Sequence, residues 1–215
     1  MKKNKTSRAW IHRHINDHYV QESKRLGYRS RAAFKLTEMD DQHRLLKGGM
    51  RIVELGAAPG SWSQVILERT HRHGVYVLVD LLPMDPIPGA IILQGDFTHD
   101  VILTQILEIM ENKPLDLVLS DMSPNLTGVR LIDQPRIIYL GELVLEFAIQ
   151  HLAPHGACVV KTFQGDGFEA FIKAFRTTFK KVSVRKPGAS RDCSNELYIV
   201  GQGLKQMHRE TSQGV

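Results

Sequence analysis

One stretch, residues 52–62, constrains the fold of this chain more than any other. An apolar run over 52–55 ends in a turn of small residues, and a helical pattern begins at Ser61. Gly56 and Gly60 carry no Cβ, so the backbone can bend sharply there and a ligand can approach it closely. The first amides of the next helix favour an anionic group on that ligand. We therefore expect a strand, a ligand-binding turn and a helix in this order, although a plain turn without a ligand would share the pattern.

The turn departs from two common nucleotide-binding motifs. No Gly-Lys-Ser/Thr follows it, as a phosphate-binding P-loop would require. The spacing Gly56-x-x-x-Gly60 differs from the dinucleotide fingerprint, and Pro59 removes an amide that a pyrophosphate would use. A nicotinamide oxidoreductase is therefore disfavoured.

The chain has 215 residues, enough for one sizeable core, and we expect a single domain over residues 1–215. No apolar run approaches the roughly 20 residues that span a bilayer, and the basic N-terminus lacks the apolar stretch of a secretion signal. Two cysteines indicate a reducing compartment, so we expect a cytoplasmic protein without a membrane partner. Ten histidines have no matching ligand set, and no metal site is expected.

The net charge of +5 conceals a segmental pattern. Residues 1–35 carry a net charge of +8, residues 36–172 carry −9 and residues 173–191 carry +7. We expect residues 1–35 to form a basic, helical N-terminal extension. Either basic segment alone fits a solvated face, but together they favour nucleic acid as a partner.

Strand and helix patterns alternate along the chain. Helices are expected near 10–25 and over 31–43. The second is expected to be capped by Ser30 and ended by Lys47-Gly48-Gly49. Its predicted buried residues are Phe34, Leu36 and Met39. Strands are expected at 51–55, 75–80, 90–94, 115–121, 157–163, 181–185 and 196–200, and helices from 61, over 98–111, around 136–152 and over 168–179. This alternation predicts an α/β fold with a parallel sheet covered by helices on both faces.

Polar residues stand where four of the predicted strands end, the edge at which such sheets bind ligands. Asp80 follows Gly56 by 24 residues, where an acid can accept hydrogen bonds from both hydroxyls of a ribose. Asp96 can accept one from an exocyclic amine, and Asp121 and Lys161 end two further strands. Each fits a loop cap or an ion pair when taken singly, but the four beside a glycine turn indicate a site.

These features resemble the S-adenosylmethionine-dependent methyltransferases, and specifically the bacterial family that methylates the 2′-oxygen of a uridine in large-subunit ribosomal RNA. The resemblance runs from about Trp10 to Val200. Its motifs are Tyr28-Arg29-Ser30-Arg31-Ala32-Ala33-Phe34-Lys35-Leu36, Glu54-Leu55-Gly56-Ala57-Ala58-Pro59-Gly60-Ser61-Trp62, Asp80-Leu81-Leu82-Pro83-Met84, Gln94-Gly95-Asp96-Phe97, Ser120-Asp121-Met122-Ser123-Pro124-Asn125, Val160-Lys161-Thr162-Phe163-Gln164-Gly165 and Ser190-Arg191 leading to Glu196-Leu197-Tyr198. It implies a Rossmann-like class I fold, a seven-stranded, mostly parallel sheet whose antiparallel last strand lies beside strand five.

The resemblance also implies the site residues. The implied contacts of S-adenosylmethionine are Gly56, Gly60, Trp62, Asp80, Asp96 and Asp121. The implied catalytic set is Lys35, Asp121, Lys161 and Glu196, with Lys161 in the place of the proposed proton acceptor. Two positions depart from the family pattern: Ser61 replaces a second glycine and suits a helix start, whereas Asn195 replaces an arginine and is expected to weaken an RNA contact.

Lys161 has two possible roles in such a reaction. A lysine with the usual pKa of about 10.4 is neutral only about once in 2,500 at pH 7. Lys35 and desolvation would lower the pKa of Lys161 so that it acts as a base, but Asp121 and Glu196 would raise it. Alternatively, a charged Lys161 orients the hydroxyl and stabilises the charge that develops on its oxygen.

The basic segments are expected to hold RNA next to this set. The candidate RNA contacts are Lys24, Arg25, Arg29, Arg31, Lys186 and Arg191. The resemblance implies ribosomal RNA as the partner, met in the large ribosomal subunit by a monomeric enzyme. Transfer RNA or a messenger cap is an alternative substrate, and a non-catalytic RNA-binding factor in ribosome assembly is an alternative function.

Overall fold

The computed structural model describes residues 17–191 and 194–205. The first part of the helix predicted near residues 10–25, with Trp10, Ile11 and Ile15, lies outside these ranges. Its described part is α2, His18–Leu26, whose first turn is capped by the carboxylate of Asp17. In the described ranges, no helix has both the length and the apolar character that crossing a bilayer requires.

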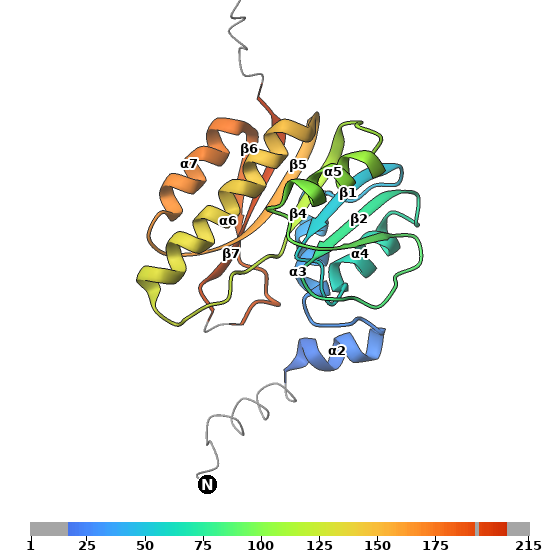
Figure 1. The fold of residues 1–215 in the computed structure, drawn as a ribbon. Helices are drawn as coiled ribbons and strands as arrows, with labels where there is room; N and C mark the ends of the chain where they lie inside the picture. The colour runs from blue at the N-terminus through green and yellow to red at the C-terminus, as the bar shows by residue number, and fades with distance from the viewer. Residues whose placement is uncertain (1–16, 192–193, 206–215) are drawn as a thin grey trace, which may run out of the picture.

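Seven strands form one sheet in the order β3-β2-β1-β4-β5-β7-β6 (Figure 1). Their bounds are β1 Met50–Leu55, β2 Gly74–Asp80, β3 Ile91–Gln94, β4 Leu115–Ser120, β5 Leu152–Phe163, β6 Phe179–Arg185 and β7 Glu196–Leu204. The pairs among β1 to β5 are parallel, whereas β7 runs antiparallel to both β5 and β6. The predicted Rossmann-like sheet, with the last strand beside the fifth, is confirmed.

Helices cover both faces of the sheet (Figure 1). Their bounds are α3 Ala33–His43 and α4 Ser61–Arg69 on one face, and α5 Asp100–Ile109, α6 Arg130–His151 and α7 Phe168–Thr178 on the other. Successive residues of β1 supply the two cores in turn, because side chains alternate along a strand. Val53 and Leu55 pack under α5 to α7, and Ile52 packs under α3 and α4.

The predicted start of α3 at residue 31 was wrong, whereas its predicted end at residue 43 is confirmed. Ser30 does not cap the helix: its hydroxyl accepts from the Ala32 amide at 3.2 Å, in a turn that precedes α3. The helix ends before Lys47-Gly48-Gly49, because Arg44 takes a left-handed conformation with φ of 52°. Leu36 and Met39 are buried as predicted, whereas Phe34 is only half-buried.

Three further elements are longer than their sequence patterns indicated. α6 begins at Arg130 and contains Pro135, which lacks an amide to donate to the Leu131 carbonyl. That carbonyl lies in the first turn, at an exposed end of the helix where water can reach it, so the proline is tolerated. β5 begins at Leu152 rather than at Ala157, and β7 continues to Leu204, because neighbouring strands supply hydrogen-bond partners over this length.

Candidate active site

Gly56 and Gly60 shape the turn between β1 and α4, and their nearest neighbours are protein atoms. Gly56 has φ of +76°, and a Cβ there would lie 2.7 Å from Cγ and 2.8 Å from the amide nitrogen of Met122. Gly60 has φ of +101°, and a Cβ there would lie 2.5 Å from Cδ1 of Ile87. The glycines are therefore needed for the loops after β4 and β2 to close against the turn, a reason that the sequence did not reveal.

Three carboxylates follow β2, β3 and β4 at one edge of the sheet. Asp80 accepts hydrogen bonds at 2.8 Å from the Ala58 amide, within the glycine turn, and from the amide two residues after itself. Asp96 accepts from the amide and the hydroxyl of Thr98, and these bonds lower the pKa of its carboxyl. Asp121 follows β4 directly and donates its amide to the Leu55 carbonyl at 3.0 Å. The predicted acids thus lie around the turn that ends β1.

The two predicted lysines form two ion pairs with the two predicted acids. Nζ of Lys35, on α3, lies 2.6 Å from Oε1 of Glu196, at the start of β7. Nζ of Lys161, near the end of β5, lies 2.6 Å from the main-chain oxygen of Asp121 and 3.1 Å from its Oδ1. The side chains of all four residues are less than one-fifth exposed, at 12%, 12%, 10% and 19% for Lys35, Glu196, Lys161 and Asp121.

Tyr198 joins these two pairs into one hydrogen-bonded chain. Its hydroxyl donates to Oδ1 of Asp121 at 2.6 Å and accepts from Nζ of Lys35 at 3.2 Å. Burial, followed by the charges of Asp121 and Glu196, raises the pKa of Tyr198 well above its ordinary value, so the phenol stays protonated. The sequence analysis gave Tyr198 no role, although the alternation of a strand puts it on the same face as Glu196, two residues away.

The ionised form of Glu196 is stabilised by its neighbours. Burial alone would raise the pKa of this carboxyl, but the charge and hydrogen bond of Lys35 outweigh it. Lys161 and a hydrogen bond at 2.9 Å from the Ser190 hydroxyl act in the same direction. The net effect is a pKa below the ordinary value, so Glu196 is an anion at neutral pH.

Glu54, on β1 next to the glycine turn, is a buried acid that the sequence analysis left without a role. It is 1% exposed and accepts a hydrogen bond at 2.6 Å from the hydroxyl of Ser63, on α4. Burial raises its pKa to about 8, and the nearby charges of Asp121 and Asp80 contribute to the rise. The sequence does contain a sign of this role, because Glu54 is an acid within an otherwise apolar strand. A buried acid of this kind must find a partner or lose its charge.

Trp62, a predicted cofactor contact, has a buried side chain. Its indole is 2% exposed, lies 5.6 Å from the ring of Tyr198 between centroids, and donates to the Ala32 carbonyl at 2.8 Å. Because protein atoms enclose the indole, the main chain is the part of Trp62 that faces the glycine turn. The neighbouring Ser61 begins α4 as predicted and pairs with the hydroxyl of Ser30 at 2.7 Å.

Two predicted RNA contacts are engaged within the protein. The Arg29 guanidinium donates to three carbonyls: Pro59 at 2.7 Å, and Asp85 and Pro86 at 3.1 Å each. The Arg31 guanidinium pairs with Asp17 and donates to the Ala189 carbonyl, with 15% of its side chain exposed. These partners give both arginines a structural role, which sequence could not reveal because each partner is distant along the chain or in a loop.

The other predicted RNA contacts lie on the surface. Lys24 and Arg25 are exposed in the last turn of α2, where Arg25 pairs with Glu22. Lys186 and Arg191 are exposed in the segment between β6 and β7. Among the described residues, no group of three or more histidine, cysteine or acidic side chains is arranged to hold a metal ion.

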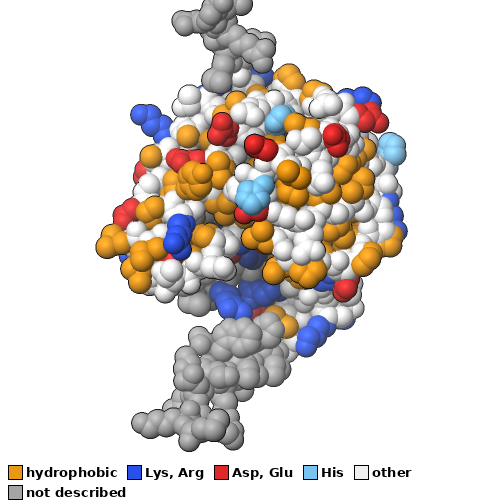
Figure 2. Space-filling model, viewed as in Figure 1, with side chains coloured by type: hydrophobic (Ala, Val, Ile, Leu, Met, Phe, Trp, Pro, Cys, Tyr) orange, Lys and Arg blue, Asp and Glu red, His pale blue; other side chains and the backbone are white. Residues whose placement is uncertain are grey.

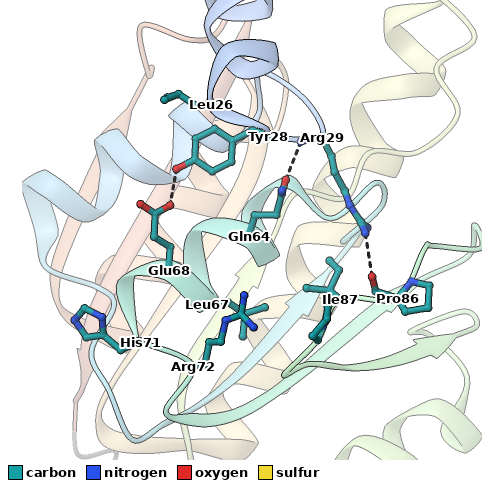
Figure 3. A pocket seen from close by; sticks show the side chains of 11 residues that line it. Leu26, Tyr28, Arg29, Gln64, Leu67, Glu68, His71, Arg72, Pro86 and Ile87 are labelled. Atoms are coloured by element: carbon teal, nitrogen blue, oxygen red, sulfur yellow. Dashed lines mark hydrogen bonds between the residues drawn. The ribbon is translucent and has the colours of Figure 1, made fainter.

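A separate cavity of about 680 Å³ lies outside the catalytic set. Figure 3 shows Tyr28 and Glu68 on one side of it, joined by a hydrogen bond of 2.7 Å, with Arg72 and Ile87 among its other lining residues. None of the four catalytic candidates lines this cavity. It lies along α4, away from the Lys35–Glu196 and Lys161–Asp121 pairs.

Comparisons with known proteins identify the family of this chain. The model of the FtsJ-like methyltransferase family matches residues 28–204. A protein of Azoarcus sp. (strain BH72) named ribosomal RNA large subunit methyltransferase E is 54% identical over 205 residues, which cover 95% of this chain and 100% of that protein. A protein of the same name from Bordetella pertussis is 49% identical over 210 residues, with 95% of this chain and 100% of that protein covered.

A solved structure extends the comparison. The crystal structure of a ribosomal RNA methyltransferase, described as putative, from Plasmodium falciparum is 31% identical to this chain, with a TM-score of 0.75. The match covers 82% of this chain and 98% of that one. The family model and the full-length relatives both span the glycine turn and the four charged residues, and the chain therefore belongs to the FtsJ-like methyltransferase family.

Proposed function

We propose that this protein is an S-adenosylmethionine-dependent ribose 2′-O-methyltransferase that acts on a uridine of the large-subunit ribosomal RNA. One observation carries the proposal: Lys35, Glu196, Tyr198, Asp121 and Lys161 form a continuous hydrogen-bonded chain beside the glycine turn. The names of the full-length relatives support the ribosomal substrate. With ribosomal particles as substrate, the protein works in the cytoplasm, and we propose that it works as a monomer.

The acids around the turn fit S-adenosylmethionine better than a dinucleotide. Asp80, Asp96 and Asp121 surround the site with carboxylates, which suit a sulfonium, an ammonium, an exocyclic amine and ribose hydroxyls. The same charges would repel a pyrophosphate. Gly56, Gly60 and the main chain of Trp62 would form the wall of this cofactor site. S-adenosylmethionine supplies an activated methyl group on a positively charged sulfur, with a neutral thioether as the leaving group.

The protein has to align a ribose hydroxyl with that methyl group and manage its proton. Lys161 is well placed to orient the hydroxyl, because Asp121 holds its Nζ through two oxygens. These bonds use two positions of the nitrogen and leave a third for the substrate. Lys35 and Glu196 form the other end of the hydrogen-bonded chain. The Tyr198 hydroxyl connects them to Asp121 by hydrogen bonds to Lys35 and to Asp121.

We propose that Lys161 stays charged and stabilises the negative charge that develops on the ribose oxygen, while the hydroxyl proton passes to a water molecule as the methyl group is transferred. The carboxylates of Asp121 and Glu196 favour an ammonium at this place. A neutral Lys161 acting as a base would make the rate constant of the chemical step rise with pH through the pKa of Lys161. A charged Lys161 predicts a flat profile over the same range, measured in single-turnover reactions.

The function is tested by incubating the protein with labelled S-adenosylmethionine and large ribosomal subunits from cells that lack its gene. We expect label in the 2′-O-methyl group of one uridine, recognised because its phosphodiester linkage resists alkali. Protein-free ribosomal RNA and transfer RNA, incubated in parallel, identify the form of the substrate. Label on a base, or in transfer RNA alone, would contradict the proposal.

A further inference from the structure

Five large apolar side chains are exposed where α6 begins. They are Leu126 at 52%, Val129 at 49%, Leu131 at 81%, Ile132 at 44% and Tyr139 at 62%. A single exposed leucine needs no explanation. Several within one loop and about the first three turns of a helix form a patch of the kind that marks an interaction site. We call these five residues the α6 apolar face.

The exposed charges within the α6 apolar face are positive. Arg130 and Arg136 are both exposed between its members and Asp133 is buried at 7% exposure, whereas the nearest exposed acid on α6, Glu142, lies one turn beyond Tyr139. Figure 2 shows apolar side chains together with a Lys or Arg at the end of the molecule where α6 begins in Figure 1. An apolar surface with two exposed arginines between its members is complementary to a polyanion that also has flat apolar faces.

Hydrogen bonds to a buried carboxylate fix the loop of the α6 apolar face. Both carboxylate oxygens of Asp133 anchor the preceding loop: one accepts from the amide and the hydroxyl of Thr127 at 2.8 and 2.9 Å, and the other accepts from the Gly128 amide at 2.9 Å. The buried carboxylate therefore fixes the loop that carries Leu126 and Val129 in an exposed position. A fixed surface loses less conformational entropy when a partner binds.

The position of the face identifies its partner. The loop that carries it starts at Asp121, the residue that holds Lys161. We propose that the RNA strand adjoining the methylated nucleotide lies on the α6 apolar face, with bases against Tyr139 and Leu131 and phosphates at Arg130 and Arg136. This inference rests on the proposed function, because it takes the nucleotide seated at Lys161 as its starting point.

The contacts expected there have known strengths. Stacking of one base on an aromatic ring contributes about 1–3 kcal/mol, a factor of roughly 5 to 150 in affinity. An arginine–phosphate contact adds about one to the slope of log affinity against log salt concentration. The face would thus hold RNA without reading much of its sequence.

The test uses large ribosomal subunits from cells that lack the gene, and compares variants of the α6 apolar face with matched controls. Tyr139→Ala and Leu131→Thr are expected to raise KM for subunits about 5-fold or more with little change in kcat. Arg136→Gln should weaken binding and lower the salt slope by about one. The controls are Ile91→Thr and Arg44→Gln, exposed residues of the same kinds at the amino ends of β3 and β1, and these should behave as wild type.

A photo-crosslinking amino acid placed at residue 139 identifies the occupant. We expect an adduct with the subunit that ribonuclease removes. An adduct with a ribosomal protein would overturn the proposal, as would an unchanged KM in every variant of the face while wild type methylates subunits. If wild type methylates no RNA at all, the proposed function fails instead. Unaltered melting temperatures and cofactor binding show that the variants are folded.

Discussion

Nζ of Lys161 lies 2.6 Å from the main-chain oxygen of Asp121 and 3.1 Å from its carboxylate, so one residue holds the ammonium twice. The main-chain contact fixes Lys161 to the end of β4, and the carboxylate contact ties it to Tyr198. The reacting end of Lys161 is therefore placed by strands β4, β5 and β7 together.

Replacing Lys161 should abolish catalysis without unfolding the protein. In Lys161→Met, kcat is expected to fall by about 10²- to 10⁴-fold, because the group that handles the hydroxyl proton or its charge is gone. The Asp121 carboxylate keeps its hydrogen bond from Tyr198 and is more exposed than that of Glu196, so we expect a lower melting temperature but a folded protein. The measurements are single-turnover methylation, melting temperature and S-adenosylmethionine binding.

The same variant separates an enzyme from an assembly factor. Lys161→Met is expressed in cells that lack the gene. If it restores ribosome assembly without methylation, the cellular role of the protein does not depend on catalysis by the hydrogen-bonded residues.

Removing Lys35 should destabilise the protein through Glu196. Lys35→Met leaves a carboxylate that is 12% exposed without its ammonium, which costs about 3 kcal/mol or more. The pKa of Glu196 should then rise, since Lys35 is the largest influence holding it down. The double variant Lys35→Met/Glu196→Gln is expected to recover most of the melting temperature and none of the activity. Equal melting temperatures for Lys35→Met and wild type would refute the pairing.

Glu54 should make the folded protein less stable as pH rises, whereas Glu196 contributes stability that is lost as pH falls. The pKa of Glu54 is about 8 in the folded protein, against an ordinary value of 4.5. The unfolded chain thus releases this proton first as pH rises, and the folded state loses stability between about pH 4.5 and pH 8. Glu54→Gln mimics the protonated acid and has no such loss.

The melting temperature of Glu54→Gln minus that of wild type should therefore be near zero at pH 4.5 and increase toward pH 8. Subtraction at each pH removes the effects of all other titrating groups. A difference that stays constant across this range would show that Glu54 is ionised in the folded protein.

An added methyl group at Gly56 should disrupt the cofactor turn. Gly56→Ala places Cβ within 3 Å of Met122 at a φ of +76°, so the loop that begins at Asp121 must move. We expect S-adenosylmethionine binding to weaken at least 10-fold, measured by calorimetry. Gly203→Ala is the matched control: its φ is +68°, but the nearest atom is the Lys180 Cδ at 3.4 Å. It should share the backbone strain and keep cofactor affinity.

Variants of Arg29 and Lys24 should distinguish a cation that stabilises the fold from one that contacts RNA. Arg29→Ala removes three hydrogen bonds to carbonyls of two loops and is expected to cost about 1–3 kcal/mol of stability. Lys24→Ala should leave the melting temperature unchanged and lower the salt slope of RNA binding by about one. A lower salt slope for Arg29→Ala at unchanged stability would restore Arg29 as an RNA contact.

Much of the fold follows from local sequence. The alternating strand and helix patterns identified the α/β class, and the turn with Gly56 and Gly60 predicts its ligand-binding edge. The boundary errors concern α3 and α6. At Pro135, a helix breaker is tolerated near an exposed helix end, and at Arg44 the helix ends without a glycine.

The sequence alone determined the order of the helices and strands, because periodicity and turn chemistry are properties of neighbouring residues, and its motifs predict which charged residues belong to the site. Only the tertiary structure decided that Lys35 pairs with Glu196 and Lys161 with Asp121, and that Tyr198 joins the pairs. It also decided that Arg29 is held by carbonyls and Glu54 by Ser63. The physical reason is that desolvation and charge pairing depend on distances of a few ångströms between residues far apart in the chain, which no local pattern encodes.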